Sequence, residues 1–191
     1  MRAKFFLTLI LMLALTACGP MFGSMMLKSN GVKDFKVVTG QLSDLKPGSK
    51  VLVIAPFTIT AESFYICRGE DATMFVDEFN KSGLFMADYH MADQFGDNTA
   101  LIKRLKGESP MQIQTELGLA EAPDYLVTGT IMKRETVAAP TKGVLMRATY
   151  RLEFTNLSNS KKTILEINAQ ELFQDTIPAV VKDLVKRMTG R

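Results

Sequence analysis

The sequence predicts an α/β fold, a mixed sheet of about four to five strands with helices packed on it. Residues 51–57 form an uninterrupted run rich in β-branched side chains, which is typical of a strand covered on both faces. Segments with helical spacing follow it and alternate with further strand-like segments. Residues 146–173 then alternate apolar and charged side chains across a turn, which predicts an antiparallel hairpin.

The first 17 residues are predicted to be a signal peptide. Arg2 and Lys4 precede the apolar run 5–15, which is shorter than the roughly 18 residues needed to span a membrane. Residues 15–18, Leu-Thr-Ala-Cys, resemble the lipobox of bacterial lipoproteins. That resemblance implies cleavage before Cys18, lipidation of its thiol and acylation of the new amino group. The alternative is an ordinary secretory signal whose cleavage point adjoins a cysteine.

Residues 18–49 are expected to form a lipid-anchored tether, followed by a single α/β domain over 50–191. Near Cys18 lies a group of apolar residues that we call the apolar knot: Met21, Phe22, Met25, Met26 and Leu27. It is able to lie against the bilayer surface or pack on a neighbouring subunit; the alternative is that it is part of a poorly ordered tether. About 30 residues of flexible coil have a root-mean-square span near 30 Å, and about 100 Å fully extended. The later residues 35–38 are able to form a short edge strand. The tether is therefore expected to hold the domain close to its membrane.

Charge and residue counts exclude several classes of site. The formal net charge is +3, and it falls by two when Arg2 and Lys4 leave with the signal, so nucleic-acid binding has no support. With Cys18 acylated, Cys67 is alone, either buried or reactive, and a disulfide framework is excluded. His90 is the only histidine, so a His-rich metal cluster cannot form. We expect no metal and no cofactor.

The first half of the domain begins at a Pro-Gly turn just before the strand 51–57. The loop 58–69 has an unusual apolar content, including Phe64 and Tyr65, and stays unassigned. A helix over 70–82 follows, with acidic residues in its first turn and a glycine just past its end. A short strand over 84–89 comes next.

Two short helices are predicted after that strand. The first covers 99–106 and carries a small basic face, which is usually a solvated surface. The second begins with Ser109 as N-cap, Pro110 at the first helical position and Gln112 at N3, which together form a capping box. Its boundaries should be the most reliable of the domain.

The second half is predicted to be mostly β. A strand over 125–131 leads into a polar connection over 132–144. The strands 146–155 and 163–173 then form the hairpin, and its charged outer face includes Arg147, Arg151 and Glu153. A helix over 177–189 closes the chain, with an apolar stripe on one side and basic residues on the other.

Several stretches between residues 50 and 173 resemble one bacterial family. They are Val-Leu-Val-Ile-Ala-Pro-Phe at 51–57, Asn-Lys-Ser-Gly-Leu-Phe at 80–85, Glu-Leu-Gly at 116–118, Ala-Pro-Asp-Tyr-Leu-Val-Thr-Gly-Thr-Ile at 122–131 and Tyr-Arg-Leu-Glu-Phe-Thr-Asn-Leu at 150–157. They are similar to the periplasmic domain shared by the lipoproteins CsgG, of curli secretion, PelC, of exopolysaccharide export, and LpoB, an activator of penicillin-binding proteins. The resemblance implies an anticodon-binding-domain-like fold, no cofactor, and function through protein contacts, often as a ring of identical subunits.

The resemblance also implies an outer-membrane lipoprotein that faces the periplasm. Gly19 in place of aspartate after the lipidated cysteine agrees with transfer to the outer membrane. The polar connection and the short tether favour a PelC-like, membrane-proximal ring or scaffold in a secretion or export system. An activator of a peptidoglycan synthase is the alternative.

Catalysis has little support in the sequence. The strongest enzymatic hypothesis is a hydrolase in which His90 acts as base for Cys67, or pairs with Asp88, and no third orienting residue or oxyanion loop stands out. We therefore expect a protein that is not an enzyme. The candidate interaction surfaces are the apolar knot near Cys18, the loop residues Phe64 and Tyr65, and the charged face with Arg147, Arg151 and Glu153.

Overall fold

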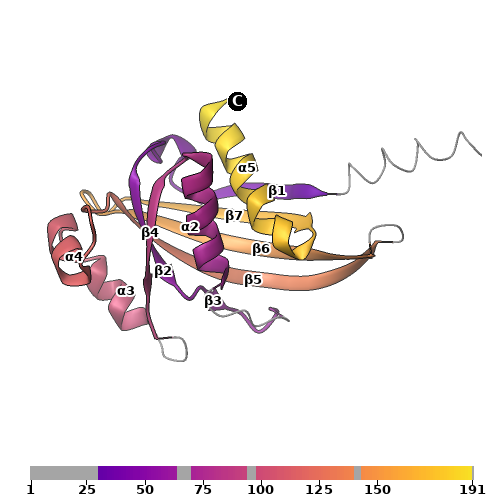
Figure 1. Cartoon of the computed structure of the whole chain (residues 1–191), viewed down its shortest axis with the longest axis horizontal. Coiled ribbons are helices and arrows are strands. Elements are labelled where there is room, and N and C mark those ends of the chain that lie inside the picture. Colours follow the sequence, from indigo (N-terminus) through magenta and orange to yellow (C-terminus); the bar gives the residue numbers. More distant parts are fainter. Residues whose placement is uncertain (1–29, 64–69, 94–97, 140–142, 191) are drawn as a thin grey trace, which may run out of the picture.

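The computed structural model describes residues 30–63, 70–93, 98–139 and 143–190 and confirms the mixed α/β class. Its seven-stranded sheet has the order β1-β7-β6-β5-β2-β4, with β3 pairing only with β5 (Figure 1). The strands are β1 (Gly31–Thr39), β2 (Lys50–Ala55), β3 (Thr58–Ile59), β4 (Met86–Met91), β5 (Tyr125–Ala139), β6 (Gly143–Asn156) and β7 (Lys162–Glu171). The helices are α2 (Glu70–Ser82), α3 (Thr99–Leu105), α4 (Pro110–Leu117) and α5 (Thr176–Thr189). Parallel pairing joins β2 to β4 and β5, and antiparallel pairing joins β5, β6, β7 and β1.

The sheet has more strands than the sequence predicted. The short β3 lies in the loop left unassigned and pairs with β5 beyond the end of β2. The strand β1 lies inside the segment assigned to the tether and pairs along its length with β7; it contains the short edge strand expected at 35–38 and extends it in both directions. Most of its side chains are exposed, so the segment lacks the apolar alternation that identifies a half-buried strand. The stretch between Cys18 and the sheet is correspondingly shorter.

The expectation of a polar connection over 132–144 is wrong. Residues of this segment continue β5 and begin β6, which pair in register as far as Ala139 and Gly143. A bulge at Met132 shifts the register and interrupts the period of two. It also places Arg134 on the buried side of the sheet, where a charged residue argues against a strand when only the sequence is considered.

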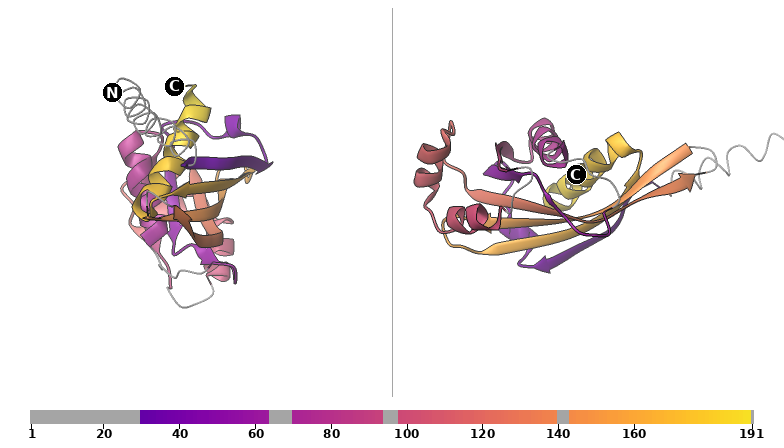
Figure 2. Two further views of the ribbon diagram at one scale, coloured as in Figure 1. Left: turned by 90° about the vertical axis from the view of Figure 1, so that its right-hand side faces the viewer. Right: turned by 90° about the horizontal axis from the view of Figure 1, so that it is seen from below.

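Two apolar clusters lie on opposite faces of the sheet. The larger one joins α2 and α5 to residues such as Val53 of β2 and Leu152 of β6. The smaller one places Leu105 and Ile113 of α3 and α4 against alternate residues of β2 and β5. Helices thus cover β2 on both faces, as its continuous apolar run predicts. Figure 2 shows α2 and α5 together on one side of the long strands.

The described helices include none that is both long and apolar enough to cross a lipid bilayer.

Candidate functional site: a charged face of the sheet

Three of the predicted interaction residues lie together on one face of β6. Arg147, Arg151 and Glu153 alternate with the buried Ala148 and with other core residues, so their side chains leave the sheet on the side away from α2 and α5. This confirms the predicted alternation of the strand. The cross-strand partners on β5 and β7 belong to the same face. We call this surface, with Arg147, Arg151 and Glu153 at its centre, the charged face.

Arg147 and Arg151 are held by residues of the neighbouring strands. The Arg147 guanidinium donates to Glu135 Oε1 of β5 at 3.0 Å and, through Nη2, to Gln170 Oε1 of β7 at 2.7 Å. Four residues further along β6, Arg151 Nη2 donates to Glu166 Oε2 at 3.0 Å. Such ladders position the side chains, but partly exposed pairs add only about 0–1 kcal/mol each to stability. The charged face is therefore ordered and largely neutralised by its own partners.

Glu153 is the junction between the charged face and α3. Its Oε1 accepts from Nζ of Lys106, the residue directly after α3, at 2.7 Å and lies 3.2 Å from Lys162 Nζ at the start of β7. Partial burial acts to raise the pKa of Glu153, but the hydrogen bonds and charges of the two lysines outweigh it and lower that pKa. The carboxylate is therefore ionised at neutral pH, and two ammonium groups share one of its oxygens.

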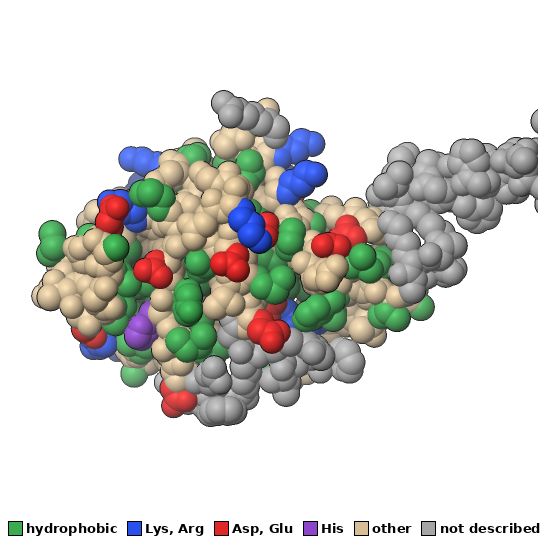
Figure 3. Space-filling view, in the orientation of Figure 1, with side chains coloured by type: hydrophobic (Ala, Val, Ile, Leu, Met, Phe, Trp, Pro, Cys, Tyr) green, Lys and Arg blue, Asp and Glu red, His purple; other side chains and the backbone are tan. Residues whose placement is uncertain are grey.

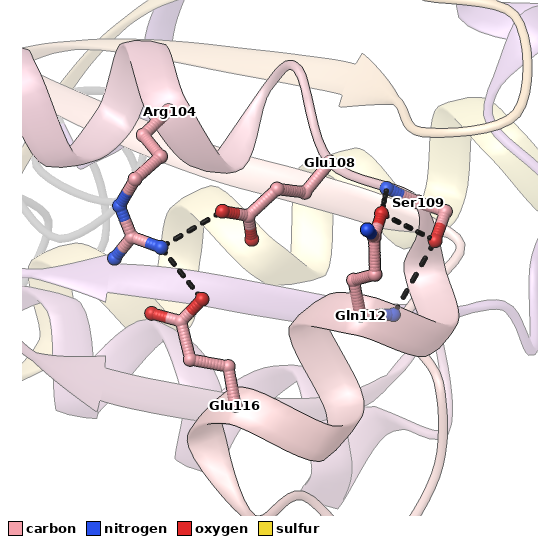
Figure 4. Close-up of polar contacts among 5 residues, drawn as sticks. All are labelled: Arg104, Glu108, Ser109, Gln112 and Glu116. Atoms are coloured by element: carbon pink, nitrogen blue, oxygen red, sulfur yellow. Dashed lines mark hydrogen bonds and ion pairs between the residues drawn. The ribbon is translucent and has the colours of Figure 1, made fainter.

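Helix α3 is held in place through α4. Arg104 Nη1 donates to Glu108 at 2.8 Å and to Glu116 of α4 at 2.6 Å (Figure 4). At the start of α4, Ser109 Oγ accepts from the Gln112 amide, while the Gln112 side chain accepts from the Ser109 amide. This confirms the capping box and the helix start predicted from the sequence.

A buried ion pair with a tyrosine is the part that sequence reasoning missed. Arg134 Nη2 of β5 donates to Asp71 Oδ1 in the first turn of α2 and, at 3.2 Å, to the Tyr150 hydroxyl oxygen. The Tyr150 hydroxyl donates to the same Asp71 oxygen at 3.1 Å. In the sequence, Asp71 is one of the acidic residues of a predicted first helical turn, and Arg134 falls in the predicted polar connection. No spacing signal links two residues that lie 63 positions apart.

The other predicted site residues fall in different places. Cys18, Phe64, Tyr65 and Cys67 lie outside the described residues. Directly before Phe64, the Ser63 hydroxyl donates to the Ile131 carbonyl at 2.7 Å, which ties Ser63 to β5.

His90 and Asp88 share a face of the edge strand β4 but do not form the orienting pair of the enzymatic hypothesis. Asp88 Oδ1 accepts instead from the Tyr89 amide at 2.8 Å. Within the described residues there is also no group of three or more histidine, cysteine or acidic side chains placed to hold a metal ion.

The free edge of β4 is covered by side chains. Its outward-facing groups at Ala87 are both used, because Asn80 of α2 accepts from the Ala87 amide at 2.8 Å and donates to its carbonyl at 2.9 Å. Asp88 occupies the next outward amide, that of Tyr89. Such caps prevent another strand from adding to the edge. The exposed Met86, Tyr89 and Met91 remain as apolar side chains at this edge. Figure 3 shows that hydrophobic side chains are exposed at several places on this view of the molecule.

Comparison with known proteins gives only loose likenesses. No family model matches the sequence, and no curated protein matches it. Two PelC dodecamer structures from Paraburkholderia phytofirmans, one carrying a single substitution, have TM-scores of 0.47 and 0.48 at 13% and 12% identity. Both cover 81% of this chain, and this chain covers 93% and 94% of theirs. A hypothetical protein from Chlamydia trachomatis has a TM-score of 0.40 at 12% identity, over 75% of this chain and 95% of its own.

Proposed function

We propose that this chain is a lipid-anchored envelope protein without catalytic activity, which assembles with copies of itself into a scaffold. Its role is that of a ring-forming accessory of an outer-membrane secretion or export system, facing the periplasm. The resemblance of residues 50–173 to periplasmic lipoprotein domains supports the class. The observation that supports self-assembly is the distribution of exposed apolar side chains.

Exposed apolar residues lie at the two opposite edges of the sheet. At β4, the side chains of Met86, Tyr89 and Met91 are 51%, 44% and 41% exposed, and at β1 those of Val37 and Val38 are 40% and 50% exposed. These strands end the strand order on opposite sides. A head-to-tail contact between the β4 edge of one copy and the β1 edge of the next buries both sets and leaves one of each free at the ends. When the same contact is repeated and the rotation between successive copies closes on itself, the copies form a ring.

The contact at β4 is expected to use side chains rather than added strand pairing. Asn80 and Asp88 already occupy the outward backbone groups of Ala87 and the Tyr89 amide. With these backbone groups occupied, a partner surface that presents apolar side chains fits the β4 edge best. The β1 edge of a second copy presents such side chains.

The position of β1 also favours a site close to the membrane. The sheet begins at Gly31, so about a dozen residues separate it from Cys18. Fully extended, such a segment reaches about 40 Å, and as a flexible coil it spans about 20 Å. The alternative role, activation of a peptidoglycan synthase at the inner membrane, requires a longer reach than this.

Light scattering on residues 19–191, produced without the signal, tests the assembly. We expect a mass several times that of one chain, and a shift toward the monomer when Tyr89 and Met91 are both replaced by serine. Met111→Ser is the matched control, since Met111 is 65% exposed on α4 and should leave the mass unchanged. A wild-type monomer at high concentration would contradict the ring and favour the activator.

Two further experiments test the anchor and the absence of catalysis. Cys18→Ser should keep the fold and abolish membrane fractionation; a variant that is still lipidated and membrane-bound would contradict the lipoprotein assignment.

Replacing Cys67 and His90 together with alanine should leave envelope function intact. Loss of that function in a variant that still folds and assembles would instead support the hydrolase.

A further inference from the structure

A cavity of about 450 Å³ lies between α3 and the sheet, next to the charged face. Its sheet side is formed by Ile54, near the carboxyl end of β2, and by Thr128 and Thr130 of β5, which continues beyond that end. Its other wall is α3. Openings beyond the carboxyl ends of parallel strands are the usual position of ligands in α/β sheets. The cavity is large enough for a small molecule of sugar size.

The charges around this cavity have one sign. Lys103, Lys106 and Lys162 line it, and among the described residues its lining includes no acidic side chain. In that part of the chain the carboxylate that pairs with these lysines is Glu153, which binds Lys106 and Lys162 through the same oxygen. Three ammonium groups against one carboxylate leave an excess of two positive charges. That excess matches a doubly charged anion.

Threonine hydroxyl groups also line the cavity. The Thr130 and Thr58 hydroxyl oxygens are 2.7 Å apart, and Thr58 donates to the Gly129 carbonyl at 3.2 Å. Because the Thr58 proton is used on that carbonyl, Thr130 donates to Thr58, which orients the pair. Thr128 adds a third hydroxyl to the cavity. Since the Thr58 and Thr130 protons are used within this arrangement, the Thr128 hydroxyl is the donor that, together with the lysine charges, suits the oxygens of a phosphate group.

We propose that this cavity binds a phosphate monoester, either on a free phosphorylated small molecule or on a lipid headgroup. The phosphate dianion takes the position between the three lysines, and Lys106 and Lys162 divide their contacts between it and Glu153. Lys103 supplies the contact with the least competition, because it does not share the Glu153 carboxylate. Binding is independent of the assembly proposed above, so either proposal can fail without the other.

Calorimetric titration of the whole protein in non-ionic detergent tests this assignment, at constant ionic strength and about pH 8, where the ester carries nearly two charges. The probes are inorganic phosphate, glucose 1-phosphate and dibutanoyl phosphatidic acid, a water-soluble form of the lipid group. Tighter binding of the second or the third probe identifies the free or the lipid source. Absence of binding by all three at millimolar concentration overturns the proposal.

Matched variants distinguish the cavity from general attraction to basic residues. Lys103→Ala should weaken binding on the order of tenfold, as expected for one lost charge-assisted contact. Lys182→Ala, an exposed lysine on α5, should not. Glu153→Gln should tighten binding several-fold by releasing two ammonium groups, whereas Glu166→Gln should have little effect. Equal losses for Lys103→Ala and Lys182→Ala, or weaker binding by Glu153→Gln in a folded protein, would contradict the assignment.

Discussion

Arg134 and Asp71 form an ion pair that is almost completely buried between β5 and the first turn of α2. Within the described part of the chain, Arg134 Nε and Nη1 and Asp71 Oδ2 are buried without a hydrogen-bond partner. Part of the desolvation cost of the pair is therefore not recovered by hydrogen bonds. Each buried charge is compensated by the opposite charge of its partner.

Breaking this pair from one side should be strongly destabilising. Arg134→Leu leaves the Asp71 carboxylate buried without its cation, and we expect a loss of about 3–5 kcal/mol in the free energy of unfolding. Urea denaturation measures it. Replacing both Arg134 and Asp71 by leucine should cost less than the single change. As control, Asp183→Asn, which breaks the partly exposed ion pair with Arg187, should cost at most about 1 kcal/mol. A single-variant loss of that same small size would refute the prediction.

Tyr150 should make stability fall at alkaline pH. Burial, and then the Asp71 charge, raise the pKa of its hydroxyl. Below about pH 10, the unfolded-state value, both states hold the proton and the contribution is complete. Above it the unfolded state loses the proton first, so stability falls with pH by up to about 1.4 kcal/mol per unit. Chemical denaturation from about pH 9 to 11 should show a smaller fall for Tyr150→Phe; identical pH profiles would contradict this.

Gly129 is required by the close approach of Phe57 to β5. A Cβ at Gly129 would lie 2.5 Å from the Phe57 ring, well inside van der Waals contact. Because Phe57 is buried, Gly129→Ala should reduce the free energy of unfolding by about 1–3 kcal/mol. Phe57→Leu in the same chain should recover part of that loss, a coupling that a double-mutant cycle measures. Simple addition of the two single effects would mean that the ring and the new methyl group do not collide.

Asn80 should protect the β4 edge against aggregation. Asn80→Ala frees both the amide and the carbonyl of Ala87, and we expect a loss of about 1 kcal/mol together with faster aggregation on incubation. Asn159→Ala is the control, because Asn159 accepts a backbone hydrogen bond at a turn rather than covering a strand edge. Aggregation followed by turbidity should rise only for the first variant. Equal rates in both would show that the edge is protected by other means.

Local signals were sufficient for much of the fold. The capping box of Ser109 and Gln112 predicted the start of α4, since a cap depends only on residues three positions apart. The apolar run of β2 and the alternation of β6 predicted which sides are buried, because burial follows the period of the element. Arg147, Arg151 and Glu153 were predicted as one charged face for the same reason.

Tertiary contacts decided the rest. The exposed strand β1 belongs to the sheet only because β7 is beside it, and Arg134 is tolerated inside the sheet only because Asp71 and Tyr150 meet it there. Lys103 and Lys106 belong to the basic face predicted over 99–106, but Lys162, at the start of β7, joins them only in the folded chain. The sequence by itself determined the class of fold, the approximate helix boundaries and the buried sides of β2 and β6, because these follow short-range periodicity. Which distant charges become partners was decided by the packing of the sheet and helices, since pairing depends on distance in space rather than separation along the chain.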